Sequence, residues 1–410
     1  MKILMVNKFY YIKGGSETYY FALKRMLELE GHIVIDFSMK DEKNFPSPYS
    51  QYFVENVDYN ENTGLTTKLR IAGNIVYSFE AKRKFEELVK KEKPDIIHLH
   101  IFQHQISPSI LDVIKKYNIP TVYTAHDLKM VCLNYKMMHH GKICEECVGG
   151  KYYHCALNRC VKESFSKSCI NVFEGYLHKW RKSYDAIDVV ITPSAFYKAK
   201  LEQFGVDGNR VCHIPNFLDR SMPDVKSNAM QEKYYLYFGR LSEEKGIMTL
   251  IKAVEDTDMK VIIVGTGPLK EKLQEYIQSK KLNNIEMLGF KLGQELTDIV
   301  SNAKAVILPS EWYENGPYSA IEALQVGRPI VGADIGGIPE LVKENGVLFA
   351  SGNSEDLKEK LLYMESLSVS DYEEMKKKSS ILFSEQYTWA SHYRKLLVAY
   401  SKAIEGKRKL

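Results

Sequence analysis

Short β-rich runs alternate with amphipathic helical segments along nearly the whole chain of 410 residues. In the first half these runs lie at residues 2–6, 33–37, 95–99, 120–124 and 189–192. The second half repeats the pattern at residues 234–238, 260–264, 285–288, 305–308 and 329–331. Because parallel strands are joined through crossing helices, this alternation predicts doubly wound α/β units, each a parallel sheet with helices on both faces.

The length of the chain suits two such units with a full core each. Between them, residues 215–231 are rich in Pro, Asn, Asp and Ser, which predicts a linker. We expect a first domain over 1–222, a second over 233–387, and a C-terminal helix over 388–410 that packs back on the first. Ligands of doubly wound sheets bind outside the carboxyl ends of the strands, so a cleft is expected where the two domains face each other.

Composition excludes several classes of protein. With 45% hydrophobic and 26% charged residues, the chain is an ordinary globular protein and neither disordered nor collagen-like. A net charge of +4 is too small to favour nucleic acid as a partner. No apolar run approaches the roughly 18 residues of a spanning helix, and the opening run is too short for a signal peptide. We therefore expect a cytoplasmic protein, in which cysteines are better explained by a metal or by burial than by disulfides.

Two glutamates flank a Gly-Pro turn in the segment 311–322, which reads E-W-Y-E-N-G-P-Y-S-A-I-E. The pattern predicts a strand ending at Leu308, a loop that contains Glu314, and a helix from Tyr318 that contains Glu322. A strand that feeds a helix N-terminus presents free N–H groups to a diphosphate, and adjacent carboxylates accept hydrogen bonds from hydroxyls. This segment indicates a sugar-nucleotide site; two solvated carboxylates are the alternative.

Further motifs follow other predicted strands in a fixed order. They are Gly14-Gly15, His126-Asp127, Phe238-Gly239-Arg240-Leu241 with Lys245-Gly246, Val264-Gly265-Thr266-Gly267-Pro268, and Gly336-Gly337-Ile338-Pro339-Glu340. Together with the two glutamates, they resemble a retaining glycosyltransferase of family 4, of the bacterial polysaccharide-biosynthesis type. The resemblance spans nearly the whole chain. It implies the GT-B fold, in which two Rossmann-like domains face each other and the active site lies between them.

The resemblance assigns roles to individual residues. His126 is expected near the sugar ring and its reacting carbon, Glu314 at the hydroxyls of the donor sugar, and Glu322 at those of the ribose. Catalysis is assigned to His126, Glu314, Arg240 and Lys245. Donor binding is assigned to Gly14, Gly15, Gly239, Arg240, Lys245, Gly265, Gly267, Gly316, Pro317, Tyr318 and Glu322. Glycines let the backbone approach the phosphates or the acceptor, where a Cβ atom would obstruct it.

Arg240 and Lys245 are expected to stabilise the leaving group. Departure of a nucleoside diphosphate develops negative charge, which two cations and helix N–H groups can stabilise. An exposed Arg and Lys on a surface loop are the alternative. The chain departs from the commoner Gly-Phe-Gly form by having Asn315-Gly316-Pro317-Tyr318 after the first glutamate, and Pro317 lacks an N–H group. The sequence therefore does not identify the donor sugar, which is carried on UDP or GDP.

Three other patterns suggest competing sites. Asp256-Thr257-Asp258 resembles a metal-binding acidic pair but precedes its strand, at the wrong end of the sheet. Gly265-Thr266-Gly267 lacks the third glycine of a dinucleotide fingerprint, which argues against a nicotinamide cofactor. His98 and His100 share one face of a strand, where they form either a metal pair or a cleft-lining or core pair. No catalytic metal is expected.

Four cysteines lie in an insertion at residues 128–170, spaced Cys144-x2-Cys147-x7-Cys155-x4-Cys160. This spacing suits one structural zinc held by four thiolates. Reduced, partly buried cysteines without a metal are an equal alternative, and the near-neutral charge disfavours a nucleic-acid module. Since the insertion follows His126, it is expected to overhang the cleft and shape the acceptor site.

The predicted function is retaining transfer of a hexose from a UDP or GDP sugar to a saccharide acceptor, plausibly lipid-linked, in cell-surface polysaccharide synthesis. A nucleotide-sugar epimerase of the same fold and a donor-binding protein without turnover are the alternatives. Segments 65–93 and 164–184 carry aromatic and basic residues at helical spacing. They predict either peripheral contact with the inner face of the plasma membrane or stripes that face the core.

Overall fold

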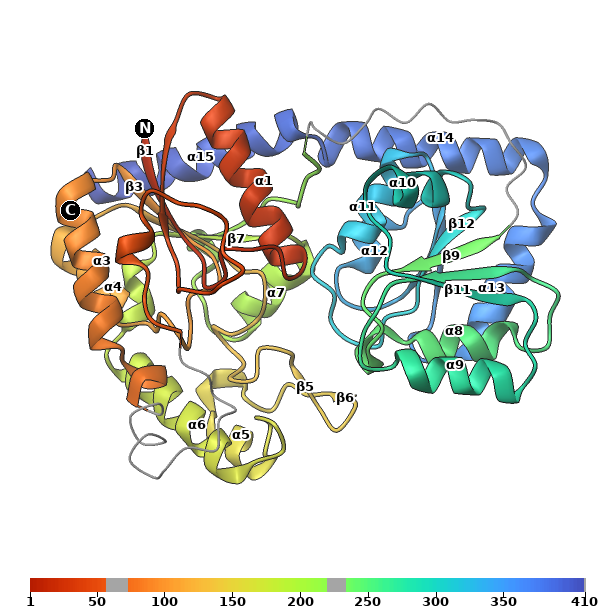
Figure 1. Cartoon of the computed structure of the whole chain (residues 1–410), viewed down its shortest axis with the longest axis horizontal. Helices are drawn as coiled ribbons and strands as arrows, with labels where there is room; N and C mark the ends of the chain where they lie inside the picture. Colours follow the sequence, from red (N-terminus) through yellow and green to blue (C-terminus); the bar gives the residue numbers. More distant parts are fainter. Residues whose placement is uncertain (57–72, 220–233, 409–410) are drawn as a thin grey trace.

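The computed structural model describes residues 1–56, 73–219 and 234–408, and it shows two α/β lobes (Figure 1). Each lobe contains one six-stranded sheet in which every pair of neighbouring strands is parallel. The first sheet has the order β2-β1-β3-β4-β7-β8 and the second the order β11-β10-β9-β12-β13-β14. The chain is therefore a pair of Rossmann-like domains, as predicted.

The strands of the first lobe are β1 Lys2–Val6, β2 Ile33–Phe37, β3 Ile96–Leu99, β4 Thr121–Thr124, β7 Val189–Thr192 and β8 Val211–His213. Those of the second are β9 Tyr235–Phe238, β10 Val261–Val264, β11 Ile285–Gly289, β12 Ala305–Leu308, β13 Ile330–Ala333 and β14 Gly346–Phe349. A small antiparallel hairpin pairs β5 Met138–His139 with β6 Lys142–Ile143.

The first lobe carries α1 Gly15–Leu29, α3 Phe79–Glu92, α4 Ile110–Tyr117, α5 Tyr153–Leu157, α6 Phe165–Trp180 and α7 Ala195–Gln203. The second carries α8 Ile247–Val254, α9 Lys270–Ser279, α10 Gly293–Ser301, α11 Tyr318–Gln325, α12 Ile338–Leu341, α13 Ser354–Ser366 and α14 Val369–Gln386, and α15 Trp389–Arg408 ends the chain. Short 3-10 helices are η1 Ser50–Tyr52, η2 Val148–Gly150, η3 Ser183–Ala186, η4 Gly208–Arg210 and η5 Glu243–Lys245.

The first sheet is buried on both faces, which explains why its strands read as continuous apolar runs. In β1, Ile3 and Met5 belong to the cluster that includes α1 and α15, whereas Leu4 and Val6 belong to the cluster that includes α3 and α4. Alternate side chains of a strand point to opposite faces, so one strand supplies both cores.

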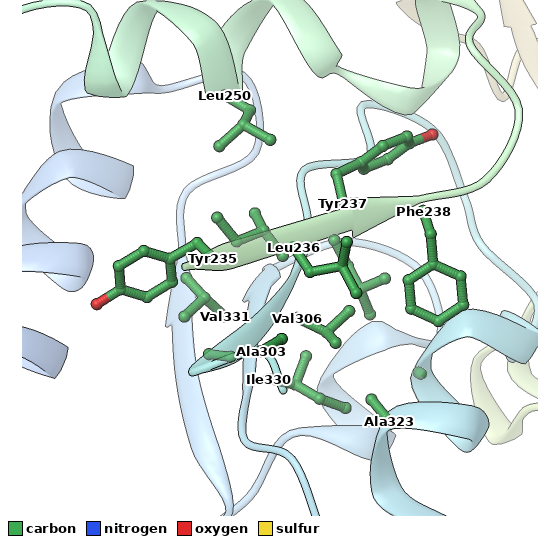
Figure 2. Close-up of a cluster of buried hydrophobic side chains, with 14 of the residues drawn as sticks. Tyr235, Leu236, Tyr237, Phe238, Leu250, Ala303, Val306, Ala323, Ile330 and Val331 are labelled. Carbon is green, nitrogen blue, oxygen red and sulfur yellow. The ribbon is translucent and has the colours of Figure 1, made fainter. Parts of the chain in front are cut away.

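The core of the second lobe centres on β9 (Figure 2). Leu236 of this strand lies among Val306 of β12, Ile330 of β13 and Ala323 of α11 in one buried cluster. Because β9 is the middle of the sheet, with β10 on one side and β12 on the other, its carboxyl end is held firmly. The loops after β9 and β12 therefore start from fixed positions.

The C-terminal helix α15 packs on the first lobe although it follows the last element of the second. It contacts β4 and β7, and its residues Leu396 and Tyr400 are buried in the first-lobe core. The Tyr400 hydroxyl lies 2.8 Å from Nδ1 of His98 in β3. The preceding helix α14 packs on α11 of the second lobe, so the chain passes from one lobe to the other between α14 and α15 (Figure 1).

The ten predicted parallel strands all form, with ends that differ by two residues at most. Two edge strands, β8 and β14, and the hairpin β5–β6 were not predicted. β8 has only three residues, and β14 begins with a glycine; both are only partly buried, so neither gives the clear apolar run of the central strands. Residues 220–233 lie outside the described part of the chain, and the proposed domain boundary and most of the predicted linker fall there.

Truncation of Leu396 to Ala should destabilise the first lobe. The side chain is fully buried between α15 and the sheet, so its loss leaves a cavity and should lower the free energy of unfolding by about 2–5 kcal/mol in urea titrations. Val398→Ala, two residues along the same helix but 70% exposed, is the control and should change it by less than about 0.5 kcal/mol. Equal effects of the two changes would contradict the packing described.

Candidate active site

The loop between β12 and α11 presents the first predicted carboxylate. It leaves the sheet after Leu308, and α11 begins at Tyr318, where Pro317 fills the N-cap position with an extended backbone. Gly316 has φ +72°, a conformation that side chains with a Cβ atom rarely adopt. The expected strand, loop and helix thus form, with Glu314 in the loop and Glu322 inside the helix.

Glu314 is buried and pairs with Lys245. The Lys245 Nζ atom donates to Glu314 Oε1 at 2.6 Å, and Ser310 Oγ donates to the same oxygen at 2.6 Å. Burial alone would raise the pKa of the Glu314 carboxyl, but the Lys245 ammonium and these hydrogen bonds outweigh it and hold the pKa below its usual value. The predicted sugar-binding carboxylate is therefore ionised and in contact with the predicted phosphate-binding cation.

Glycines let the loops of the second lobe pack closely behind this pair. A Cβ atom on Gly265, which has φ +141°, would lie 1.9 Å from the carbonyl oxygen of Gly239. Gly337 donates its N–H to the carbonyl oxygen of Glu314 at 2.8 Å. Three of the predicted glycine motifs are thus in contact with each other or with the Glu314 loop.

Arg240 follows β9 by two residues, as predicted, and its side chain is exposed. Its carbonyl oxygen accepts a hydrogen bond from the Tyr237 hydroxyl at 2.8 Å, which fixes the backbone of the loop. Lys245 ends the short helix η5, directly before Gly246 and α8. Convergence of the Arg240 guanidinium with Lys245 on one diphosphate stays a prediction.

Glu322 is half-buried on α11, one turn after Tyr318. Burial raises the pKa of its carboxyl to about 7. Tyr318 in turn lies against the Gly14-Gly15 loop of the other lobe, since a Cβ atom on Gly15 would lie 3.5 Å from its ring. The structure thus places the first glycine motif beside the helix that carries the second glutamate.

His126 lies just after β4 and shares a hydrogen bond with His100, at 3.1 Å between Nε2 and Nδ1. Burial lowers the pKa of His126 to about 3, so its ring is neutral. The His98 and His100 rings stack at 4.4 Å between centroids, and both nitrogens of His98 are engaged, by Tyr400 and Thr124. His98 is therefore a core residue and not one half of a metal pair.

Asn315 joins the two halves of the site. Its side-chain amide donates to the carbonyl oxygens of Ala125 at 2.9 Å and His126 at 3.3 Å, and its Oδ1 accepts from Ser194 Oγ at 2.9 Å. Because Asn315 is the neighbour of Glu314, these bonds bring the predicted sugar-binding loop against the loop that carries His126. The two lobes therefore touch at Asn315, beside the loop that carries His126.

The cysteine insertion also reaches the second lobe. Glu145 Oε1 accepts a hydrogen bond from the Tyr313 hydroxyl at 2.6 Å, and Lys136 Nζ lies 3.8 Å from Glu244 Oε1. All four predicted cysteine ligands, Cys144, Cys147, Cys155 and Cys160, line one small cavity together with Cys132. His139, Cys144 and Glu146 bring one ligand atom each to within 4.8 Å of one another.

Sequence reasoning missed several polar residues at this junction. Ser310 supports the Glu314 carboxylate, and Asn315 bridges the lobes; both stand in the loop that was already singled out. Lys8 follows β1, and burial lowers the pKa of its ammonium to about 8, although Asp127 opposes the shift. Their position in the sequence could have identified them as site residues, because Lys8 and Asp127 both follow the carboxyl ends of strands, where ligands of such sheets bind.

Two parallel α/β domains that face each other, with a paired cation and carboxylate in loops after neighbouring strands of the second sheet, are the architecture of the GT-B fold. Residues 13–221 match the family described as Glycosyltransferase Family 4, and residues 220–380 match Glycosyl transferases group 1. The chain therefore belongs to glycosyltransferase family 4.

Several similar proteins are glycosyltransferases by name. An uncharacterized glycosyltransferase of Methanocaldococcus jannaschii is 24% identical over 396 residues, which is 95% of each chain. The putative colanic acid biosynthesis glycosyltransferase WcaL of Salmonella typhimurium is 26% identical over 209 residues, 46% of this chain and 50% of WcaL. Among solved structures, sucrose-phosphate synthase from Thermosynechococcus elongatus superposes with a TM-score of 0.70, at 17% identity over 97% of this chain and 99% of that one.

HepE of Anabaena, solved in complex with UDP and glucose, superposes with a TM-score of 0.63. It is 16% identical and is matched over 98% of this chain and 99% of its own. At such identities the superpositions describe the fold, and they agree with the two sheets described above.

Replacement of Glu322 by Gln should flatten the pH dependence of stability. In the unfolded chain this carboxyl titrates near about 4.3, so between that pH and about 7 only the unfolded state is ionised. The group therefore lowers the free energy of unfolding as pH rises through this window, and its cost is complete above about 7. Glu322→Gln should gain on the order of 1–3 kcal/mol relative to wild type at pH 8 and little at pH 4.

The measurement is urea unfolding of wild type and variant at both pH values without nucleotide. Glu275→Gln, at an exposed position of α9, is the matched control and should differ from wild type equally at both. A constant difference between Glu322→Gln and wild type across the pH range would contradict the assigned burial effect.

Proposed function

We propose that this glycosyltransferase transfers a hexose, with retention of configuration, from a UDP or GDP sugar to a saccharide acceptor. One observation carries the proposal: the Lys245–Glu314 pair at the carboxyl edge of the second sheet is joined through Asn315 to the His126 loop of the first. A cation for the diphosphate, an acid for the sugar and a group from the acceptor side thus occupy one junction.

The donor binds to the second lobe in this proposal. Lys245 and Arg240 hold the diphosphate, with help from the N–H groups at the start of α11, where the positive end of the helix dipole lies. Glu314 accepts hydrogen bonds from sugar hydroxyls and Glu322 from ribose hydroxyls. The HepE complex with UDP and glucose supports a nucleotide sugar as the ligand class.

Transfer occurs on one face of the sugar. The bond between the anomeric carbon and the diphosphate oxygen breaks while the acceptor oxygen bonds to the same face of that carbon. The acceptor's hydroxyl proton moves to an oxygen of the leaving diphosphate. Lys245 stabilises the charge that develops on this leaving group, and the neutral His126 ring offers a hydrogen bond near the reacting carbon. No protein nucleophile and no catalytic metal take part.

The acceptor binds to the first lobe, between the loops that follow β1 and β4 and the cysteine insertion. The relative WcaL is named for colanic acid biosynthesis, which supports an acceptor saccharide that becomes part of a cell-surface polysaccharide. A growing saccharide of this kind is carried on a lipid in our proposal, and the enzyme works in the cytoplasm.

Lys245→Ala should lower kcat/KM by roughly 100- to 1000-fold, the effect of losing one preorganised donor to a developing charge. Lys252→Ala, at an exposed position of α8 shortly after Lys245, is the matched control and should leave kcat/KM unchanged. The assay is release of nucleoside diphosphate in the presence of acceptor. A decrease of less than about threefold for Lys245→Ala, in protein that remains folded, would remove the cation from the mechanism.

Screening UDP, GDP and their hexose derivatives by thermal shift identifies the donor, and NMR of the product then gives its anomeric configuration. Retention of the donor's anomeric configuration, with turnover that requires acceptor, supports the proposal. An altered sugar formed from donor alone identifies an epimerase, and affinity without nucleotide release identifies a binding protein. A product of inverted configuration would contradict same-face transfer.

The cavity lined by Cys144, Cys147, Cys155 and Cys160 binds one structural zinc in our proposal. Soft thiolates at this spacing favour zinc, and a metal would order an insertion whose strands span only two residues each. Cys132 lines the same cavity and is a fifth candidate ligand. Because Glu145 stands between two of the ligands and bonds to Tyr313, the metal would also hold the insertion against the Glu314 loop.

Protein purified without chelators should contain about one zinc per chain by mass spectrometric elemental analysis. Cys155→Ala should lose this zinc, whereas Cys212→Ala, on the edge strand β8 away from the cavity, should keep it. Wild type that stays free of zinc even after incubation with zinc salts under reducing conditions would show that the cluster is metal-free.

A further inference from the structure

Helix α6 is oriented with its polar side chains inward and its aromatic side chains outward. Its buried residues are Ser168, Asn171, Glu174 and His178. Its exposed large side chains are Phe165 at 56% exposure, Phe173 at 61%, Tyr176 at 39% and Trp180 at 80%. This is the reverse of the usual surface helix, in which the apolar stripe faces the core.

The inward face is fixed by specific polar contacts. Glu174 forms a buried ion pair with Lys129 at 3.1 Å. The His178 ring bonds to Ser183 Oγ at 2.9 Å and to the carbonyl oxygen of Val76 at 2.8 Å. Rotation of the helix to bury its aromatic face would break these hydrogen bonds. It would also separate the ion pair and leave Lys129 buried without its partner. The aromatic side chains are therefore held outward by the structure.

The four exposed side chains form one stripe, which we call the α6 patch. Positions 165, 173, 176 and 180 fall within about 80° of one another at about 100° per residue, so they project from the same side of the helix. The short helix α5 extends this surface, because the Tyr153 N–H donates to the Tyr176 hydroxyl at 3.3 Å, and the exposed Leu157 follows on α5. Figure 1 shows α5 and α6 beside each other at one end of the first lobe.

Basic residues surround the α6 patch. Residues 150–182 contain seven Lys and Arg but only two acidic residues, and one of these, Glu174, is buried and paired. Lys179 is exposed on α6, about 40° around the helix from Phe165, and Lys182 is exposed just after Trp180. Lys167 is also exposed but projects from the far side of the helix, and Arg181 is paired with Asp112 at 2.9 Å. The surface is therefore both aromatic and positively charged, although the whole chain is near neutral.

We infer that the α6 patch rests on the surface of an anionic lipid bilayer. An amphipathic helix with aromatic residues on one side and Lys and Arg beside them is typical of interfacial helices that lie in the headgroup region. Interfaces between proteins are instead depleted in Lys, which disfavours a second copy of the chain or a protein partner. Contact is peripheral, because no described helix is long and apolar enough to cross a bilayer.

This surface is connected to the active site by the insertion. Glu145, which belongs to the same insertion as α5, bonds to Tyr313 next to Glu314. A bilayer beneath α6 would therefore lie against the lobe that we propose binds the acceptor. The inference itself rests on the surface of α6 and not on the proposed reaction, so it is tested without turnover.

Vesicle flotation of the full chain tests the inference. Wild type should float with vesicles of mixed phosphatidylglycerol and phosphatidylcholine, bind pure phosphatidylcholine less, and lose binding as salt is added. Phe173→Ser combined with Trp180→Ser should weaken binding by at least about tenfold, because both rings leave the interface. Lys179→Glu combined with Lys182→Glu should weaken binding to the anionic vesicles only.

Phe290→Ser, which removes an exposed aromatic side chain from the second lobe, is the matched control and should bind as wild type does. Urea unfolding followed by circular dichroism, measured in parallel, shows that each variant is folded. The inference is overturned if wild type does not float with anionic vesicles, or if the α6 variants float as well as wild type. It is also overturned if light scattering shows wild type to be a dimer and the α6 variants to be monomers, because the patch would then be a protein interface.

Discussion

The ion pair between Lys245 and Glu314 is the interaction on which the rest of the site depends. A carboxylate as buried as Glu314 is expensive to ionise without a partner, and Lys245 supplies one at 2.6 Å. The two residues come from loops that follow β9 and β12, which are neighbours in the sheet. The pair therefore fixes two separate loops and places a cation and an acid side by side. Without a donor, the Lys245 ammonium and the Glu314 carboxylate neutralise each other. A bound nucleotide sugar would offer the ammonium a phosphate and the carboxylate a sugar hydroxyl.

A second set of contacts keeps the lobes together around this pair. Asn315 bonds to the carbonyl oxygens after β4, and the Glu340 carboxylate accepts the N–H groups of Ala195 at 2.8 Å and Phe196 at 2.7 Å at the start of α7. A carboxylate at a helix N-terminus is stabilised by the helix dipole and by the free N–H groups. Glu340 belongs to the Gly336–Glu340 motif, whose glycine N–H also supports the Glu314 backbone. One motif thus links the Glu314 loop to the opposite lobe.

The sequence predicted the features that depend on local pattern. Buried parallel strands are apolar throughout, so nearly all of them were recognised. The order of the motifs placed Lys245 and Glu314 in segments that follow strands, and Glu322 in the helix after the Glu314 loop. What it did not predict depends on tertiary packing. The role of Asn315 requires the other lobe, and the orientation of α6 requires Lys129, which is 45 residues away and pairs with Glu174. A helical stripe of aromatic residues has the same period whether it faces core or solvent. The same limit applies to Cys132, which joins the cysteine cavity only in three dimensions.

Calorimetric titration of UDP and UDP-glucose into wild type, Lys245→Met and Glu314→Gln tests the central claim most directly, with the GDP pair used if guanine nucleotides bind more tightly. If Lys245 holds the diphosphate and Glu314 holds the sugar, Lys245→Met should weaken both ligands, while Glu314→Gln should weaken UDP-glucose and leave UDP unchanged or tighter. Equal losses of UDP and UDP-glucose affinity in Glu314→Gln, or unchanged UDP affinity in Lys245→Met, would contradict this division of roles.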